Sequence, residues 1–208
     1  MRNKLLTILF LLFILSPLTA ASISFSGGYT TLSMREGNQQ INLSNSANVA
    51  IDNIEISANE ISLKGEDYDY IECNGNITFK DNDNQLTIRC SSLKYNRDTE
   101  EIIIEGWVEI NDLKNNIYAT ASYLQYNVEK AIIDLSVEVK LLHSSDDEVM
   151  KCSCDILRLD LEDKNVSLLG DSKVEWEENT YKAHAISINL NNNDISMDGS
   201  IEASINTK

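Results

Sequence analysis

The feature of this sequence that most restricts its fold is a break in hydrophobic alternation that recurs along the chain. In the stretch 86–95, apolar or small residues alternate, skip one position and then alternate again, at Leu86, Ile88, Cys90, Leu93 and Tyr95. A strand whose alternation changes phase without a turn signal is expected to contain a bulge or a bend.

The same skip occurs in five places. If the residue before each skip marks the register, the marks are separated by 32, 31, 33 and 31 residues, at Ala58, Cys90, Ala121, Cys154 and Ala185. A period of this size indicates a repeat architecture, in which each unit buries its apolar face only against its neighbours. We therefore expect one solenoid-like unit without an internal domain boundary.

A second type of strand lies between the copies of the first. These stretches carry a glycine or small residue near the middle and span 71–79, 102–110, 132–140, 166–176 and 195–203. Glycine inside a strand usually marks a bend or a bulge. Short polar loops join the strands, which requires sequential antiparallel pairing. The prediction is an all-β fold of bent antiparallel strands, built from about five 31-residue repeats.

The N-terminus has the pattern of a secretory signal peptide. Arg2 and Lys4 precede an apolar run, which is followed by Ser16-Pro17 and by small residues ending at Ala20 or Ala21. The run is shorter than the roughly 20 residues that a membrane span needs. The expected organisation is a signal peptide at 1–21, an N-terminal arm at 22–40 and the repeat domain at 41–208, with a retained anchor as the alternative. Export would place the protein in the periplasm.

The charge of the chain makes nucleic acid an unsuitable partner. The chain has 17 Lys and Arg against 33 Asp and Glu, a formal net charge of −16. Removing Arg2 and Lys4 with the leader would take the charge to −18. Phosphate binding needs a basic patch, which the sequence lacks. The acidic surface is interpreted as a solvated one that keeps a sheet-rich protein soluble.

Groups for catalysis are few, and we predict no enzyme, no catalytic residue, no metal site and no cofactor. The two histidines, His143 and His184, are expected at the surface. The acidic run 146–148 lacks the ligand spacing of a calcium loop. Cys90, Cys152 and Cys154 occupy positions that hold alanine in other repeats, which favours small inward thiols over disulfides or metal ligands.

The inward face of the repeats is rich in Ile, Leu, Val and small residues. Two interpretations remain open from composition alone. The face could form an ordinary hydrophobic core, or it could line an open groove wide enough for acyl chains.

A strand of the form Gly-x-Val-x-hydrophobic followed by one of the form small-x-x-hydrophobic-x-Tyr, as in 106–110 and 121–126, resembles the OstA-like domain family. This is the fold of the periplasmic lipopolysaccharide bridge LptA, shared with LptC and the N-terminal part of LptD. The resemblance covers 41–205 and implies a β-jellyroll, V-shaped in section, that shields the acyl chains of lipopolysaccharide or a related glycolipid. Such subunits join end to end through edge strands, here expected near 41–51 and 195–205.

The resemblance also implies partners and contact residues. The implied partners are a second copy of the chain and LptC-like and LptD-like proteins, and the length and leader are more similar to LptA than to either of those. Inward candidates for lipid contact are Ile56, Ile61, Ile88, Leu93, Val108, Ile110, Ala119, Leu124, Val137, Val139, Leu157 and Ile188. The alternatives are an envelope scaffold with a filled core and no cargo, or a membrane-anchored LptC-like subunit.

Overall fold

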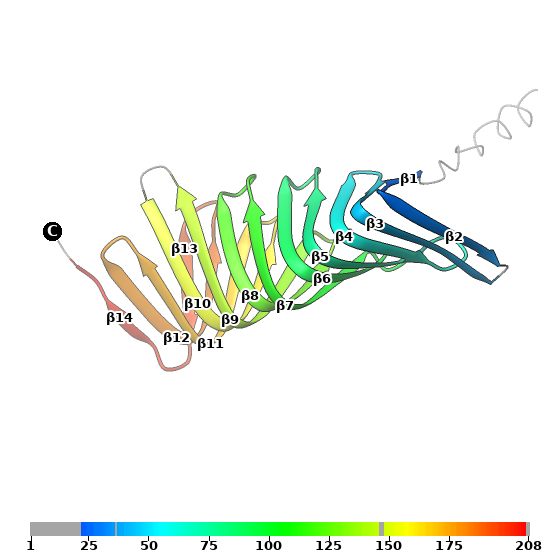
Figure 1. The fold of residues 1–208 in the computed structure, drawn as a ribbon. Coiled ribbons are helices and arrows are strands. Elements are labelled where there is room, and N and C mark those ends of the chain that lie inside the picture. The colour runs from blue at the N-terminus through cyan, green and yellow to red at the C-terminus, as the bar shows by residue number, and fades with distance from the viewer. Residues whose placement is uncertain (1–21, 36, 146–147, 207–208) are drawn as a thin grey trace, which may run out of the picture.

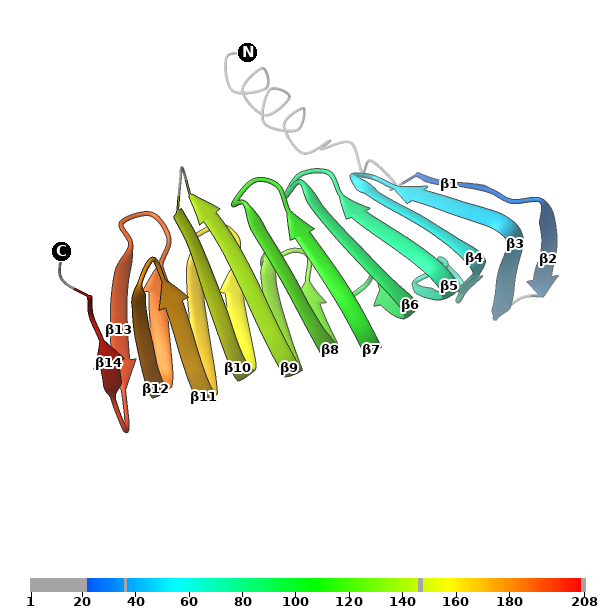
Figure 2. The same cartoon turned by 60° about the vertical axis from the view of Figure 1, so that its left-hand side comes forward.

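In the computed structural model, which describes residues 22–35, 37–145 and 148–206, the chain forms one continuous antiparallel sheet. The strands stack side by side, and most of them bend near the middle, so that the sheet folds into two facing arms (Figures 1 and 2). The signal peptide expected at 1–21 lies outside the described residues. So do two residues of the acidic run, 146 and 147.

Fourteen strands are described. Their bounds are β1 Ile23–Ser26, β2 Tyr29–Arg35, β3 Asn38–Ile51, β4 Ile54–Lys64, β5 Tyr70–Asp81, β6 Leu86–Asn96, β7 Glu101–Asp112, β8 Ile117–Asn127, β9 Ile132–Ser145, β10 Glu148–Asp160, β11 Asn165–Trp176, β12 Asn179–Asn189, β13 Asp194–Asp198 and β14 Glu202–Ser204. The sheet order is β1-β3-β4 and so on in sequence to β13, while β2 pairs with β3 and β14 pairs with β12.

The all-β meander predicted from the sequence is confirmed. Each strand from β3 to β12 pairs antiparallel with its neighbours in the chain. The register shifts near the middle of every pair from β3–β4 to β11–β12, for example between Asn74 and Ile77 on β5. The shifts follow one another from strand to strand and form a continuous crease across the sheet.

The segment 22–40 contributes to the same sheet. It contains β1, β2 and the first residues of β3, and β1 and β2 pair with the two halves of β3. The expected edge at 41–51 is therefore wrong, because β1 and β2 cover that strand. The edges of the described sheet are β1 with β2 at one end and β13 with β14 at the other (Figure 1).

The crease is made by left-handed residues in the odd-numbered strands. Positive φ angles occur there at Asn45 and Ser46, Gly75 and Asn76, Gly106, Val137 and Glu138, and Gly170 and Asp171, and again between β13 and β14 at Gly199 and Ser200. In the even strands β4 to β12 of the described chain, positive φ angles lie outside the strand bounds, in the turns. A left-handed step reverses the direction of the pleat, so each odd strand turns a corner there.

Glycine at the corner also permits a close approach from the adjacent even strand. A Cβ at Gly75 would lie 2.6 Å from Nδ2 of Asn59, and one at Gly170 would overlap the carboxylate of Asp155. Gly106 differs, because nothing lies within 4 Å of its Cβ position. Glycine is thus needed at Gly106 for its φ of 102° alone.

The inward assignment of Val137 is wrong. Val137 takes the corner position, 31 residues after Gly106, with a φ of 67°, and its side chain is 56% exposed. The left-handed backbone turns the side chain to the outside although its sequence parity matches that of buried Leu135 and Val139. A β-branched residue is an outlier in this conformation, so the corner is strained.

The turns stack in two rows. The described turns that follow odd strands, at 52–53, 82–85, 113–116 and 177–178, form row A. Those that follow even strands, at 65–69, 97–100, 128–131, 161–164 and 190–193, form row B. Backbone N–H groups join each row, as from Asn82 to the Asn53 carbonyl in row A and from Val128 to the Glu100 carbonyl in row B. Successive repeats are therefore linked at their turns as well as through their strands.

Replacing Val137 by glycine is expected to stabilise the protein. The change removes a left-handed β-branched residue, which costs about 1–2 kcal/mol, and adds a backbone entropy cost of about 0.5–1 kcal/mol. We expect the free energy of unfolding to rise by about 1 kcal/mol, measured by urea denaturation. The converse change Gly106→Val adds strain without overlap and should lower it. A lower denaturation midpoint for Val137→Gly would contradict the assignment of strain.

Candidate functional site

The space between the two arms is the candidate site, and it is lined by the predicted inward residues. Eleven of the twelve candidates are at most 2% exposed and belong to one hydrophobic cluster: Ile56, Ile61, Ile88, Leu93, Val108, Ile110, Ala119, Leu124, Val139, Leu157 and Ile188. Val137 is the exception described above. Contact of these residues with a lipid stays a prediction.

The interior is apolar along the whole stack. The cluster runs from Ile41 on β3 to Ile188 on β12 and consists mainly of Ile, Leu, Val and Ala. Two large aromatic residues join the arms in the middle. Phe79 of β5 and Tyr126 of β8 meet edge to face, with ring centroids 6.5 Å apart and planes at 84°.

A polar contact closes the mouth of the fold opposite the crease. The Tyr126 hydroxyl, near row B, donates a hydrogen bond of 2.6 Å to Oδ2 of Asp81, near row A. Nδ2 of Asn84 donates to the same hydroxyl at 3.1 Å and to Oδ2 of Asp81 at 2.9 Å. Burial, and then the adjacent Asp81 carboxylate, raise the pKa of Tyr126, so its hydroxyl keeps its proton for the bond.

A second contact lies one repeat further on. Asp112, fully buried, accepts from the backbone N–H of Asn115 at 3.0 Å and from its Nδ2 at 2.7 Å. The same Nδ2 reaches the Leu161 carbonyl in row B at 3.5 Å. We call Asp81, Asn84, Tyr126, Asp112 and Asn115 the polar clasp.

The contacts across the mouth are offset along the stack. Asp81 on β5 meets Tyr126 on β8, and Asn115 after β7 meets Leu161 after β10. Each contact thus joins positions three strands apart. Because strands in a sheet twist relative to one another, two arms of one folded sheet cross at an angle, and the offset follows from that crossing.

The two arms belong to one continuous sheet, since each strand crosses the crease, where the pairing register shifts. The strand pairs of the described chain all belong to the serial order from β1 to β13 and its two side pairs, so the sheet is not closed into a barrel. At the mouth, the hydrogen bonds between row A and row B of the described chain are donated by side chains of the polar clasp. An opening of the mouth would therefore leave the strand pairing intact.

The cysteines have little thiolate character. Burial raises the pKa of Cys73 and Cys152 to about 12 and that of Cys90 and Cys154 to about 11. All four are free, and Cys73, Cys152 and Cys154 are buried. A protonated thiol is a poor nucleophile and a poor metal ligand. The structure agrees with the interpretation of small packing residues.

The two histidines are far apart in the fold. His184 is exposed on β12, as predicted. His143 lies within β9 and is half-buried, with burial lowering its pKa and Asp112 opposing that shift. Among residues 22–35, 37–145 and 148–206, no group of three His, Cys, Asp or Glu side chains is placed to hold a metal ion.

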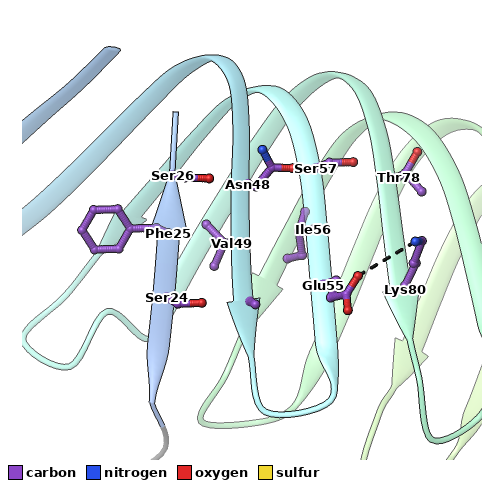
Figure 3. Close-up of a pocket in the computed structure, with 11 residues that line it drawn as sticks. Ser24, Phe25, Ser26, Asn48, Val49, Glu55, Ile56, Ser57, Thr78 and Lys80 are labelled. Carbon is purple, nitrogen blue, oxygen red and sulfur yellow. Dashed lines mark ion pairs between the residues drawn. The ribbon is translucent and has the colours of Figure 1, made fainter. Parts of the chain in front are cut away.

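The hollows of the surface have a different chemistry. A hollow of about 390 Å³ lies over β1, β3, β4 and β5. Figure 3 shows its small polar side chains, including Ser57 and Thr78, beside the Glu55–Lys80 ion pair of 3.9 Å, while Val49 and Ile56 point to the other side of the sheet. The lining of this hollow is thus mixed, whereas the interior between the arms is apolar.

The apolar interior reaches the surface at both ends of the stack. Phe25, Leu32 and Met34 are exposed on β1 and β2, and Ile201 and Ile205 are exposed beside β14. Leu32 pairs with buried Ile41, so its side chain lies on the same face of the sheet as the interior residues. The two edges carry both unpaired backbone groups and apolar side chains.

The fold of the chain is similar to that of solved structures. No protein-family model matches the chain, and no curated protein matches it in sequence. The crystal structure of LptH, described as the LptA homologous periplasmic component of the lipopolysaccharide transport device from Pseudomonas aeruginosa, aligns with 89% of this chain and 96% of its own. The identity is 12% and the TM-score 0.29, too low to transfer a function or the role of a residue.

The part of the chain that the structure describes contains no helix long and apolar enough to cross a membrane.

Sequence reasoning missed the polar clasp. The sequence pattern places Asp81 and Asn84 in the short polar segment between the strands at 71–79 and 86–95, and Tyr126 at the end of the strand motif 121–126. A weak signal was present, because Asp81 and Asp112 are 31 residues apart and each precedes an Asn by three positions. Their partners across the mouth depend on the crossing of the arms, which the sequence pattern does not give.

Substituting Tyr126 by Phe is expected to weaken closure of the mouth. The change keeps the ring contact with Phe79 but leaves Asp81 and Asn84 without the hydroxyl, which costs about 1–3 kcal/mol for buried polar groups. Urea denaturation should show this loss, whereas Tyr118→Phe, at an exposed position, should change stability by less than about 0.5 kcal/mol. Equal stability of the two variants would contradict the role of the clasp.

Proposed function

We propose that this protein is a non-catalytic periplasmic subunit that shields the acyl chains of lipopolysaccharide or a related glycolipid between its two arms. The observation that carries the proposal is the combination of a continuous apolar interior with a mouth held by a few hydrogen bonds from side chains. An acyl chain needs an apolar enclosure that can be entered from the side.

The free energies are compatible with entry at the mouth. A side-chain hydrogen bond contributes about 0.5–1.5 kcal/mol net, so separating the clasp costs a few such contacts. Burial of each methylene of an acyl chain away from water stabilises the bound state by about 0.8 kcal/mol. A chain of ordinary length would therefore offset the loss of the clasp and of part of the packing between the arms.

The ends of the stack support a place in a larger assembly. Edge strands with unpaired backbone groups accept a strand from another chain. Pairing of β1 and β2 of one copy with β13 and β14 of the next would join the interiors into one apolar path. LptC-like and LptD-like proteins with similar edges are the proposed partners at the two ends.

A second candidate function is an envelope scaffold without cargo. The observation in its favour is that the interior residues already cover one another, with exposures of at most 2% for eleven candidates. Under this alternative the core is filled by its own side chains, and the arms never separate. The next experiment distinguishes the two functions.

Photo-crosslinking residues at Ile88 and Val108 are expected to label acyl chains. Both side chains are fully buried between the arms, on β6 and β7. The outward neighbours Arg89 and Glu109 on the same strands are the matched controls. The measurement is mass spectrometry of the adducts after incubation with lipopolysaccharide, and Tyr126→Phe should increase the yield.

Labelling from Arg89 and Glu109 alone would refute the acyl-chain site. If no position crosslinks to lipid, and the native and delipidated forms of the protein have the same mass, the function of an envelope scaffold is favoured.

Assembly through the edges is expected to depend on β2. Light scattering should show a mass that increases with concentration for the wild type, and Leu32→Lys with Met34→Lys should abolish the increase by placing charge on the exposed edge. Leu113→Lys, an exposed apolar residue in row A, is the control and should assemble normally. A wild-type mass that stays monomeric at high concentration would contradict strand addition.

A further inference from the structure

The outer side of the crease changes its chemistry along the stack. In β3 to β6 the exposed residues at the crease are polar, namely Asn45, Ser46, Asn59, Asn76 and Ser91. In β9, β10 and β11 the exposed residues there include Val137, Ile156 and Leu169. The repeat is thus apolar inside throughout, whereas its outside is apolar only in the C-terminal half.

These three residues form one patch. Ile156 pairs with Leu169 on β11 and with Ser136 on β9, the residue before Val137. Their exposed fractions are 56%, 45% and 43% for Val137, Ile156 and Leu169. We call these three residues the ridge patch. Single exposed apolar residues are common on protein surfaces, but a contiguous set on neighbouring strands marks an interaction site.

Trp107 extends the apolar surface in the direction of the N-terminus. It follows the corner glycine of β7 and is 53% exposed. Strand β8 lies between it and the ridge patch and contributes partly buried Tyr123, which pairs with Ser136. Apolar side chains therefore lie along the outer crease from β7 to β11.

The strain at Val137 is a second, independent observation. Four other corners have glycine with positive φ, and a fifth has Asn45, which tolerates this conformation. Val137 has a φ of 67° and exposes its side chain, so it weakens the fold without contributing to the core. A strained residue that the packing does not need points to a role in contact with another molecule.

Three exposed carboxylates lie beside the ridge patch. Glu138, Asp155 and Asp171 are exposed beside it, and none of them belongs to the ion pairs of the described residues. Of the cations on the same strands, Arg158 and Lys173 pair with Asp134 and Glu175, while Lys140 and Lys151 are exposed. The patch thus has an apolar centre, and the carboxylates beside it belong to no ion pair of the described residues.

We infer that the ridge patch and Trp107 bind a cationic amphipathic helix of a partner protein. Neighbouring strands are about 4.8 Å apart, and one helical turn rises about 5.4 Å, so a helix along the crease would set about one apolar residue on each strand. A helix that spans the four spacings between neighbouring strands from β7 to β11 has about 13 residues. Lysine or arginine on the flanks of this helix would meet the carboxylates.

The probe for the test is a 14-residue helix of leucine and lysine, with leucine on one face. Binding is measured by fluorescence anisotropy of the labelled peptide at physiological salt, where weak interactions with the acidic surface are screened. The triple variant Val137→Gly, Ile156→Asn, Leu169→Asn gives the ridge patch the polar character of β3 to β6 without changing the charge. It should weaken binding at least tenfold.

The matched control replaces three exposed apolar residues elsewhere, by Leu113→Asn, Leu142→Asn and Val149→Asn. This control should bind within twofold of the wild type. A second pair of variants tests the carboxylates. Glu138→Gln with Asp155→Asn should weaken binding about tenfold, whereas Glu129→Gln with Asp163→Asn, with the same change of charge, should not.

Three outcomes would overturn the inference. The first is that a peptide of leucine and glutamate binds as tightly as the peptide of leucine and lysine. The second is that the ridge variant and the control variant lose affinity for the peptide to the same extent. The third is that the ridge patch binds phosphatidylglycerol vesicles in place of the peptide. Val137→Gly alone, which should not impair folding, separates loss of binding from loss of structure. Since no substituted residue of the ridge lies between the arms, the result is independent of the lipid proposal.

Discussion

The left-handed corner in the middle of each odd strand is the constraint on which the rest of the structure depends. Without it, the repeats would form a flat open sheet with one apolar face in water. With it, the same residues face one another across the fold, and both arms belong to one continuous sheet. Glycine is the usual residue at the corner, since it reverses the pleat without steric cost and, at Gly75 and Gly170, makes room for a side chain of the next strand.

Closing the fold at the mouth is a separate and weaker interaction. The twist of the strands offsets the two arms by three positions, so the polar clasp joins residues 45 and 46 apart in the sequence, Tyr126 to Asp81 and Leu161 to Asn115. At the crease the backbone of each strand joins the two arms, whereas at the mouth the hydrogen bonds between the arms of the described chain come from a few side chains. Under the proposed function, the arms would separate at the mouth.

The sequence predicts the repeated strands and the crease, because a phase slip and a glycine at a 31-residue spacing are local signals with a direct physical cause, but it does not predict β1 and β2 in the segment 22–40. It failed at Val137, where parity predicted an inward side chain. At the corners with glycine the reversal leads to no wrong assignment, since glycine has no side chain whose direction must be predicted. Aligning Val137 with Gly75 and Gly106 would have identified the corner. The polar clasp could not be predicted in this way, since its pairs depend on an angle between the arms that accumulates over several strands.

The constraints on the sequence differ between the inside and the outside of the corner. Inside the fold, every repeat must supply residues that pack against the facing arm, so the interior has the same chemistry along the stack. Outside, side chains at the crease do not pack against a facing arm, so their chemistry can differ from one repeat to the next. A uniform interior cannot distinguish one end of the molecule from the other. Any directional property must therefore arise at the two edges and on the outer crease, where Asn45 and Asn76 stand at one end and Val137 and Leu169 at the other.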